Sequence, residues 1–179
     1  GRGCYGRYLF RKKLGLQRID LPGGKIALSY GPVIGEQLEQ GVDLTGGKVK
    51  LRHLHQDYPH NPERFNILYL VSSALPQYAT EIVHWAKTNG VKFVLNQNGV
   101  AYPSWTEDHK NINTELSELM SQADLVIYQS EFCREAARRF LGEPVGQWKI
   151  LPNCVDINSF KPSAKNYFDG VRLLVAGTH

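Results

Sequence analysis

The chain has 179 residues, of which 42% are hydrophobic and 21% charged, and its formal net charge is +4. This composition is sufficient for one globular domain with a substantial core. No run of about 18 or more uncharged apolar residues occurs, so no membrane-spanning helix is expected. The cysteines, at positions 4, 133 and 154, are odd in number and scattered, so a reducing cytosol is favoured over a disulfide framework.

The positive charge is concentrated at the start of the chain. Residues 1–25 hold seven lysines and arginines against one aspartate, a net charge of +6, which leaves −2 for the remainder of the +4 chain. Residues 1–24 are therefore treated as a basic arm that could contact anionic lipid headgroups or nucleic acid. The competing interpretation is a solvated tail. The opening residues lack the apolar segment of a secretory signal, so a cytoplasmic protein is expected.

The first half of the globular part begins with an apolar run and a glycine-rich loop. KIALS (25–29) predicts a short strand, and a short helix is expected around residues 36–40. KVKLRHLH (48–55) alternates, which predicts a strand with Val49, Leu51, His53 and His55 on one side. FNILYLVSS (65–73) is nearly continuously apolar, as in a strand covered on both faces. Residues 74–90 predict a helix that ends at Gly90 and turns four residues inward: Ile82, Val83, Trp85 and Ala86.

The second half repeats this alternation of strand and helix. Strands are expected at VKFVLNQ (91–97), DLVIYQS (124–130) and WKILPN (148–153). Asn113 or Thr114 could begin a helix that runs to about Ala123. Ser130 should begin the next helix, which Gly142 closes. Its inward face is expected to hold residues spaced by four: Phe132, Ala136 and Phe140.

Strands that alternate with helices predict an α/β fold with a Rossmann-like parallel sheet and helices on both faces. Ligands of such sheets bind beyond the carboxyl ends of the strands. Four loops should meet at that edge: SYGPVIGE, VSSALP, NQNGVAYPSW and PNCVD.

Two of these loops carry candidate binding groups. Gly31 and Gly35 would let backbone amides approach a ligand closely, although the loop is neither GxxxxGK[ST] nor GxGxxG and a plain turn is about as well supported. Asn96, Gln97 and Asn98 supply amides, and Tyr102 and Trp105 supply flat apolar faces, a combination that suits sugars. An ordinary Asn-Gly turn is the alternative for the amides.

Metal and thiol chemistry are less well supported. Two histidines of the predicted 48–55 strand, with Asp57 and His60, could hold a metal, but no CxxC or HExxH pattern accompanies them. We therefore expect no metal. Cys154 has no base adjacent in sequence and is expected to be a structural thiol.

Two consecutive segments form a longer pattern: DLVIYQSEFCREAARRFLG and WKILPNCVDINSFKP. Together they resemble the end of the N-terminal domain of GT-B-fold glycosyltransferases, most closely the family-four group of retaining enzymes. The pattern N-G-V-D-x-x-x-F-x-P is matched by residues 153–162, with Cys154 in place of glycine. KIALSYGP is similar to the first strand and glycine loop of that domain, and RLLVAGTH is similar to the first strand of the second domain. The resemblance covers residues 25–179.

The resemblance implies two Rossmann-like domains on either side of a cleft, with a nucleotide-sugar donor held by the C-terminal domain and no cofactor or metal beyond that co-substrate. Residues 25–152 would be the acceptor-side domain, 153–170 the interdomain connection and 171–179 the first strand of the donor domain. Residues of the donor pocket have no counterpart in these 179 residues, so the chain alone is expected to be inactive.

The resemblance also implies roles for particular residues, while leaving the catalytic residues unassigned. The donor-phosphate loop would hold Gly31, Gly35 and Glu36. The acceptor surface would hold Asn96, Asn98, Gly99, Tyr102 and Trp105. Asn153 and Asp156 would line the interdomain cleft.

The expected acceptor is a glycan or a lipid-linked sugar of a cell-envelope polysaccharide, and the basic arm would suit peripheral contact with the inner membrane face. A homodimer through residues 165–179 is expected, because the strand there would have no sheet of its own. No nucleic-acid partner is expected. The alternative is a non-catalytic carbohydrate- or protein-binding domain. A dinucleotide-binding oxidoreductase module ranks last, since GxGxxG is missing from the first turn.

Overall fold

The computed structural model describes residues 23–41, 46–154, 157–158, 161, 170–171 and 173. Asp156 lies outside the described residues, and so do most of the basic arm (1–24) and most of the predicted dimer segment (165–179) and donor-domain strand (171–179). Within the described residues, every helix is too short or too polar to cross a lipid bilayer.

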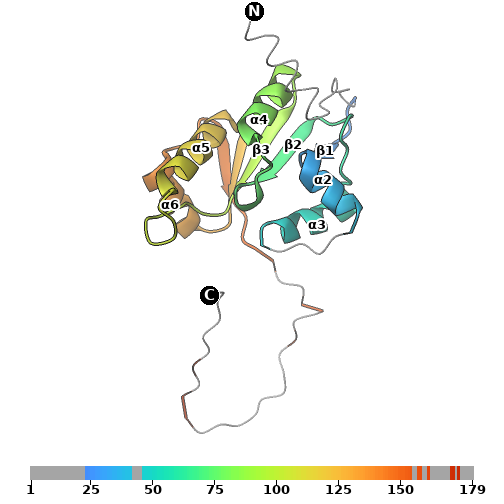
Figure 1. Ribbon diagram of the computed structural model, residues 1–179. Helices are drawn as coiled ribbons and strands as arrows, with labels where there is room; N and C mark the ends of the chain where they lie inside the picture. The colour runs from blue at the N-terminus through green and yellow to red at the C-terminus, as the bar shows by residue number, and fades with distance from the viewer. Residues whose placement is uncertain are drawn as a thin grey trace, which may run out of the picture.

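A parallel sheet forms the centre of the described structure. Its five strands lie side by side in the order in which they occur in the chain, which confirms the predicted α/β class (Figure 1). The strands are β1 (Leu28–Ser29), β2 (Ile67–Val71), β3 (Lys92–Gln97), β4 (Leu125–Tyr128) and β5 (Gln147–Ile150). All four neighbouring pairs are parallel.

Helices cover both faces of this sheet. They are α2 (Pro32–Glu39), α3 (Lys48–Asp57), α4 (Ala79–Thr88), α5 (His109–Gln122) and α6 (Glu131–Leu141), with a 3₁₀ turn η1 (Ser72–Ala74) after β2. The larger core packs α4, α5 and α6 on one face. A smaller core packs α2 and α3 against β1 and β2, on the opposite face.

Strand β2 contributes to both cores, as its continuous apolar sequence predicted. Leu68 and Leu70 belong to the larger core, whereas Ile67, Tyr69 and Val71 pack in the smaller one. Successive strand residues point to opposite faces, so a strand between two helical layers needs apolar residues at every position.

The prediction of a strand at residues 48–55 is wrong, because this segment forms helix α3. Its inward residues are Leu51 and Leu54, which are three apart, whereas His53 is exposed. Leucine, lysine and arginine dominate the segment, with Val49 the only β-branched residue, so its intrinsic preference is helical. The alternation of Val49 and Leu51 was too short to define the period.

The last two helices are placed correctly, but their details differ from the prediction. Ser130 caps α6 by accepting a hydrogen bond from the Cys133 backbone amide, as predicted. Phe132 and Phe140 are not inward but 81% and 46% exposed. The buried residues lie one position further on: Cys133, Ala137 and Leu141. Helix α5 begins at His109 rather than at residue 113 or 114.

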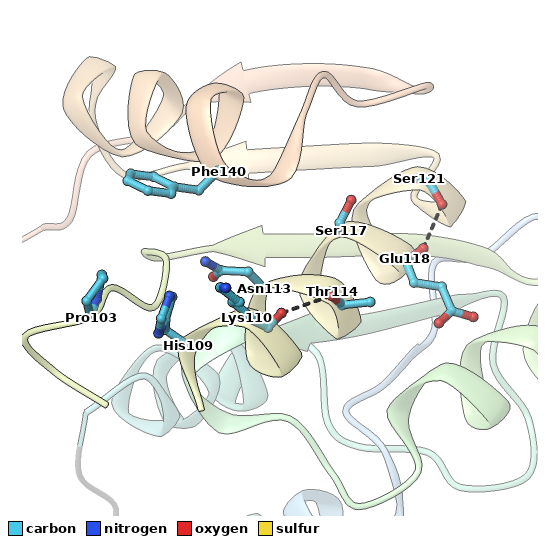
Figure 2. A pocket seen from close by; sticks show the side chains of 9 residues that line it. All are labelled: Pro103, His109, Lys110, Asn113, Thr114, Ser117, Glu118, Ser121 and Phe140. Carbon is cyan, nitrogen blue, oxygen red and sulfur yellow. Dashed lines mark hydrogen bonds between the residues drawn. The ribbon is translucent and has the colours of Figure 1, made fainter. Parts of the chain in front are cut away.

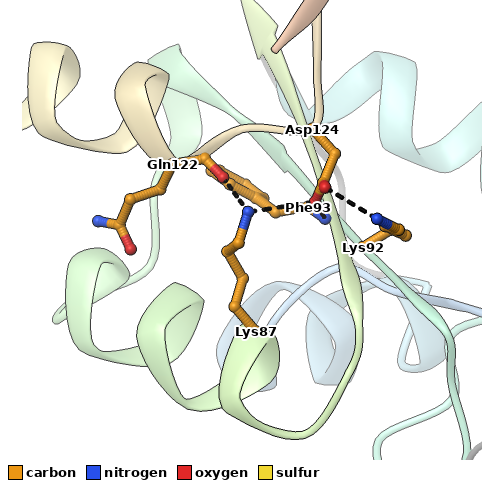
Figure 3. A network of polar contacts seen from close by, with 5 residues as sticks. All are labelled: Lys87, Lys92, Phe93, Gln122 and Asp124. Atoms are coloured by element: carbon orange, nitrogen blue, oxygen red, sulfur yellow. Dashed lines mark hydrogen bonds and ion pairs between the residues drawn. The ribbon is translucent and has the colours of Figure 1, made fainter. Parts of the chain in front are cut away.

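The amino edge of the sheet is fastened by Asp124, which precedes β4. Figure 3 shows Lys87 and Lys92 converging on its carboxylate, at 3.3 and 3.1 Å. The same carboxylate accepts the backbone amide of Phe93 at 2.8 Å. Burial tends to raise the pKa of Asp124, but these donors outweigh it and the pKa lies below its usual value. This network is at the end of the sheet opposite to the predicted site.

Candidate functional site

Amide side chains from the carboxyl ends of three neighbouring strands meet at one edge of the sheet. We call this set, Asn96, Asn98, Gln129 and Asn153, the amide crest. Gln129 Nε2 donates to the Asn98 carbonyl oxygen at 2.8 Å, and Asn153 Nδ2 donates to Gln129 Oε1 at 2.8 Å. The segments after β3, β4 and β5 are therefore joined by direct hydrogen bonds.

The segment after β2 reaches the same edge. The Asn98 backbone amide donates to Ser72 Oγ at 2.9 Å, and its side-chain Nδ2 donates to Ser73 Oγ at 2.7 Å. Gly47, which precedes α3, lies so close that a Cβ atom there would be 2.2 Å from Ser73 Oγ. Three loops predicted to meet, together with α3, are thus in contact around Asn98.

The sequence interpretation missed two residues of this edge: Gln129 of the crest and Lys50 on α3. Lys50 Nζ donates to Asn98 Oδ1 at 2.8 Å, to Asn96 Oδ1 at 3.3 Å and to Gln129 Oε1 at 3.4 Å. Burial lowers the pKa of Lys50, while the nearby Cys133 acts in the opposite direction. A helical interpretation of residues 48–57 would have placed Lys50 next to the buried face, since it lies one turn before Leu54.

Asn96 and Gln97 are more deeply enclosed than the prediction required. Asn96 is buried and also donates to the Tyr69 hydroxyl at 2.8 Å. Gln97 is fully buried; its Nε2 bonds the Gly99 carbonyl oxygen, while its Oε1 has no protein partner among the described residues. Asn98, which is partly exposed, is therefore the amide of this trio that a ligand could reach.

Gly31 lies where the helical layers change sides. The helices after β1 pack on one face of the sheet and the helix after β2 packs on the other. Gly31 has φ 84°, and a Cβ atom there would be 3.4 Å from Pro76 Cγ. The glycine is needed for the conformation and brings the β1 and β2 loops together.

Gly35 faces a histidine. A Cβ atom at this position would be 2.1 Å from His60 Nε2. His60 is buried, and its Nδ1 accepts the Tyr30 backbone amide at 3.2 Å. Burial lowers the pKa of His60; Glu39 acts in the opposite direction and His55 adds to the lowering. The space that Gly35 leaves is thus used by a neutral imidazole.

Glu36 is exposed and lines a pocket of about 320 Å³ with Gly31, Glu39 and His60. The floor of this pocket is apolar, with Phe65, Leu68, Ile82 and Trp85. Gly31 and Glu36 therefore line one pocket, whereas Gly35 does not, and their role beside a donor phosphate stays a prediction. This pocket does not include the amides of the crest.

The aromatic loop after β3 carries the other predicted acceptor residues. The rings of Tyr102 and Trp105 are 6.3 Å apart and are 49% and 63% exposed. The loop is fixed by Asn113 on α5, which accepts the Ala101 amide at 2.9 Å and donates to the Ala101 carbonyl oxygen at 2.8 Å. Gly99 has open space on its Cβ side. Asn113 clamps this loop instead of capping the helix.

A shallow groove of about 670 Å³ runs along α5 beside Phe140 of α6 (Figure 2). Pro103 of the aromatic loop is at one end of it, and hydroxyl groups of Thr114, Ser117 and Ser121 lie along it. A third hollow lies at the amino edge, next to Asp124. Neither is lined by a residue of the amide crest.

The described residues contain no group of three or more His, Cys, Asp or Glu side chains arranged to hold a metal ion. His55 Nδ1 accepts the His60 backbone amide at 3.0 Å, so that ring nitrogen is engaged in the fold. Of the predicted cleft pair, Asn153 is exposed at the crest, and Asp156 is outside the described residues.

Comparison with protein-family models, with curated proteins and with solved structures gives no match. The glycosyltransferase resemblance of residues 153–162 therefore stays a prediction. What the structure establishes is a Rossmann-like parallel α/β domain whose strand ends carry a connected set of amides around a lysine.

Proposed function

We propose that this chain provides the acceptor-side wall of a nucleotide-sugar-dependent, retaining glycosyltransferase of polysaccharide biosynthesis. The observation that supports this most strongly is the amide crest, in which Asn98, Gln129 and Asn153 from three strand ends are linked to one another. The crest lies where parallel α/β sheets bind their ligands. Amides donate and accept, so such an edge can match the mixed hydroxyl pattern of a sugar.

The chemistry of the crest fits a positioning role. An amide cannot serve as a general base, so Asn98 would orient an acceptor hydroxyl and not deprotonate it. In retaining transfer the departing diphosphate can take that proton, which leaves orientation as the task of the acceptor side. The exposed rings of Tyr102 and Trp105 would pack on the C–H face of the acceptor.

Sugar binding can be tested by NMR titration of the ¹⁵N-labelled chain with methyl glycosides of glucose, galactose and mannose. We expect shift changes at Asn98, Gly99 and the Trp105 indole. Trp105→Ala should abolish the response, whereas truncating another exposed aromatic residue, Phe132→Ala, should preserve it. A titration in which no glycoside perturbs these signals would overturn the proposal.

A second experiment separates an enzyme from a non-catalytic carbohydrate-binding domain. Because the donor is expected to bind a second domain, the chain is expressed together with any sequence that its gene encodes after residue 179, and transfer from nucleotide-sugar donors to the bound glycoside is assayed. The transferase proposal predicts turnover that Asn98→Ala lowers. A protein that binds the glycoside but transfers no sugar from any donor would support the non-catalytic alternative.

A further inference from the structure

We propose that Lys50 anchors a phosphoryl group of the ligand that occupies the amide crest. This inference rests on the proposed function, because it specifies the acceptor as a phosphorylated sugar or a lipid-linked phosphate. It concerns a residue on α3, a helix that the sequence alone did not reveal.

The first argument is the unbalanced charge of Lys50. Its three ammonium hydrogens meet three amide oxygens, on Asn96, Asn98 and Gln129. Within the described part of the chain, Lys50 forms no ion pair with an acidic side chain, and the first turn of α3 has no acidic residue. Amide dipoles satisfy the hydrogen bonds of the ammonium group but do not neutralise its charge.

The second argument is the cost of this arrangement. Lys50 is partly buried, and burial of a charge without an opposite charge is unfavourable. An anionic ligand would supply the missing charge and recover this energy through a charge-assisted hydrogen bond.

The third argument is that the surrounding groups can accommodate phosphate oxygens. The contacts of Lys50 with Asn96 and Gln129 are long, at 3.3 and 3.4 Å, so they can be exchanged for a ligand oxygen at little cost. Ser72 and Ser73 accept hydrogen bonds from Asn98, which leaves their hydroxyl protons to donate to a further acceptor. A cation and two hydroxyl groups that all bond the same asparagine, Asn98, suit a phosphate group.

The test is an NMR titration of the wild-type chain with glucose 1-phosphate, inorganic phosphate and glucose. We expect the two phosphate probes to perturb the side-chain amides of Asn98 and Gln129 and the backbone amide of Ser73. Lys50→Gln should weaken their binding about tenfold or more, as expected for loss of a charge-assisted hydrogen bond. Lys48→Gln is the matched control, because it removes a charge from the same helix while Lys48 bonds Gln37 on α2; its affinity should stay within about twofold.

The two sources of phosphate are distinguished by a vesicle arm. The chain is sedimented with phosphatidylcholine vesicles with and without phosphatidic acid. A Lys50-dependent increase with phosphatidic acid indicates a lipid-linked phosphate, and a response confined to glucose 1-phosphate indicates a soluble sugar phosphate. Both outcomes support the anchor.

The inference is overturned if the phosphate probes leave the crest signals of the wild-type chain unchanged, or if Lys50→Gln and Lys48→Gln bind them equally. The wild-type titration gives a result even if the Lys50→Gln variant fails to fold. If phosphate fails while methyl glycosides still perturb Asn98 and Trp105, the anchor is wrong and the proposed function stands. If neither class of probe acts on the crest, both are wrong.

Discussion

The clamp that Asn113 places on the aromatic loop gives the sharpest test of how this fold holds its candidate site. Asn113→Ala removes the acceptor of the Ala101 amide at 2.9 Å and the donor to the Ala101 carbonyl oxygen at 2.8 Å. Ala101 is fully buried, so both backbone groups would lose their partners away from water.

The magnitude follows from these two groups. An orphaned buried donor or acceptor costs about 1–3 kcal/mol, and local relaxation admits water to part of the loop, so we expect a loss of about 2–4 kcal/mol in the free energy of unfolding. Asn111→Ala is the control, because Asn111 lies on the same helix and its side chain bonds the exposed Asp108 side chain and no other side chain among the described residues. Its effect should be within about 0.5 kcal/mol.

Urea denaturation followed by circular dichroism measures both variants, and the chemical shifts of Tyr102 and Trp105 report on the loop. Asn113→Ala should lower the unfolding midpoint and move both aromatic signals. If Asn113→Ala and Asn111→Ala unfold at the same urea concentration, the clamp does not stabilise the loop and the reasoning fails.

Three further changes test other parts of the structure. Burial holds the pKa of His60 below the 6.5 of a free histidine. Its contribution to stability should therefore be complete above pH 6.5 and decrease as the pH falls, because the unfolded chain binds a proton more readily than the folded chain. His60→Gln should reduce this dependence of the urea unfolding midpoint on pH. Gly146→Ala should cost about 3 kcal/mol or more, because its Cβ would be 2.2 Å from a backbone carbonyl oxygen, whereas Gly99→Ala, in open space, should leave the melting temperature nearly unchanged. Asp124→Ala should cost about 2–3 kcal/mol by orphaning a buried strand amide, while Glu135→Ala, at an exposed ion pair, should not move the midpoint; equal effects of the two would contradict the role assigned to the amino edge.

Much of the sheet could be predicted because its three middle strands, β2, β3 and β4, are largely buried. The runs at residues 65–73, 91–97 and 124–130 are apolar at successive positions, and such runs have few alternatives in a folded chain. The edge at which their loops meet followed from the parallel arrangement alone. Asn98 was found for this reason, since it follows the third of the observed strands.

The wrong predictions concern two helices, α3 and the inward face of α6, where a short sequence pattern fits more than one arrangement. In KVKLRHLH the two-residue spacing of Val49 and Leu51 is typical of a strand, whereas the three-residue spacing of Leu51 and Leu54 is typical of the helix that forms. In α6, the large aromatic residues Phe132 and Phe140 were predicted to face inward, but the smaller residues Cys133 and Ala137 are the ones that are buried against the sheet.

Lys50 could not be found before the helix was known. Its partners Asn96, Asn98 and Gln129 are 46 to 79 residues away in the chain, and nothing local marks a lysine whose neighbours are amides. The clamp by Asn113 was hidden in a similar way, because an asparagine near a helix start is equally suited to capping.

The order of the sheet has a consequence for how the chain is made. Each strand from β2 to β5 pairs with the strand synthesised immediately before it, so the partner of each new strand is already present at the edge of the growing sheet. The domain can therefore be lengthened or shortened at its last strand without disturbing any earlier pairing.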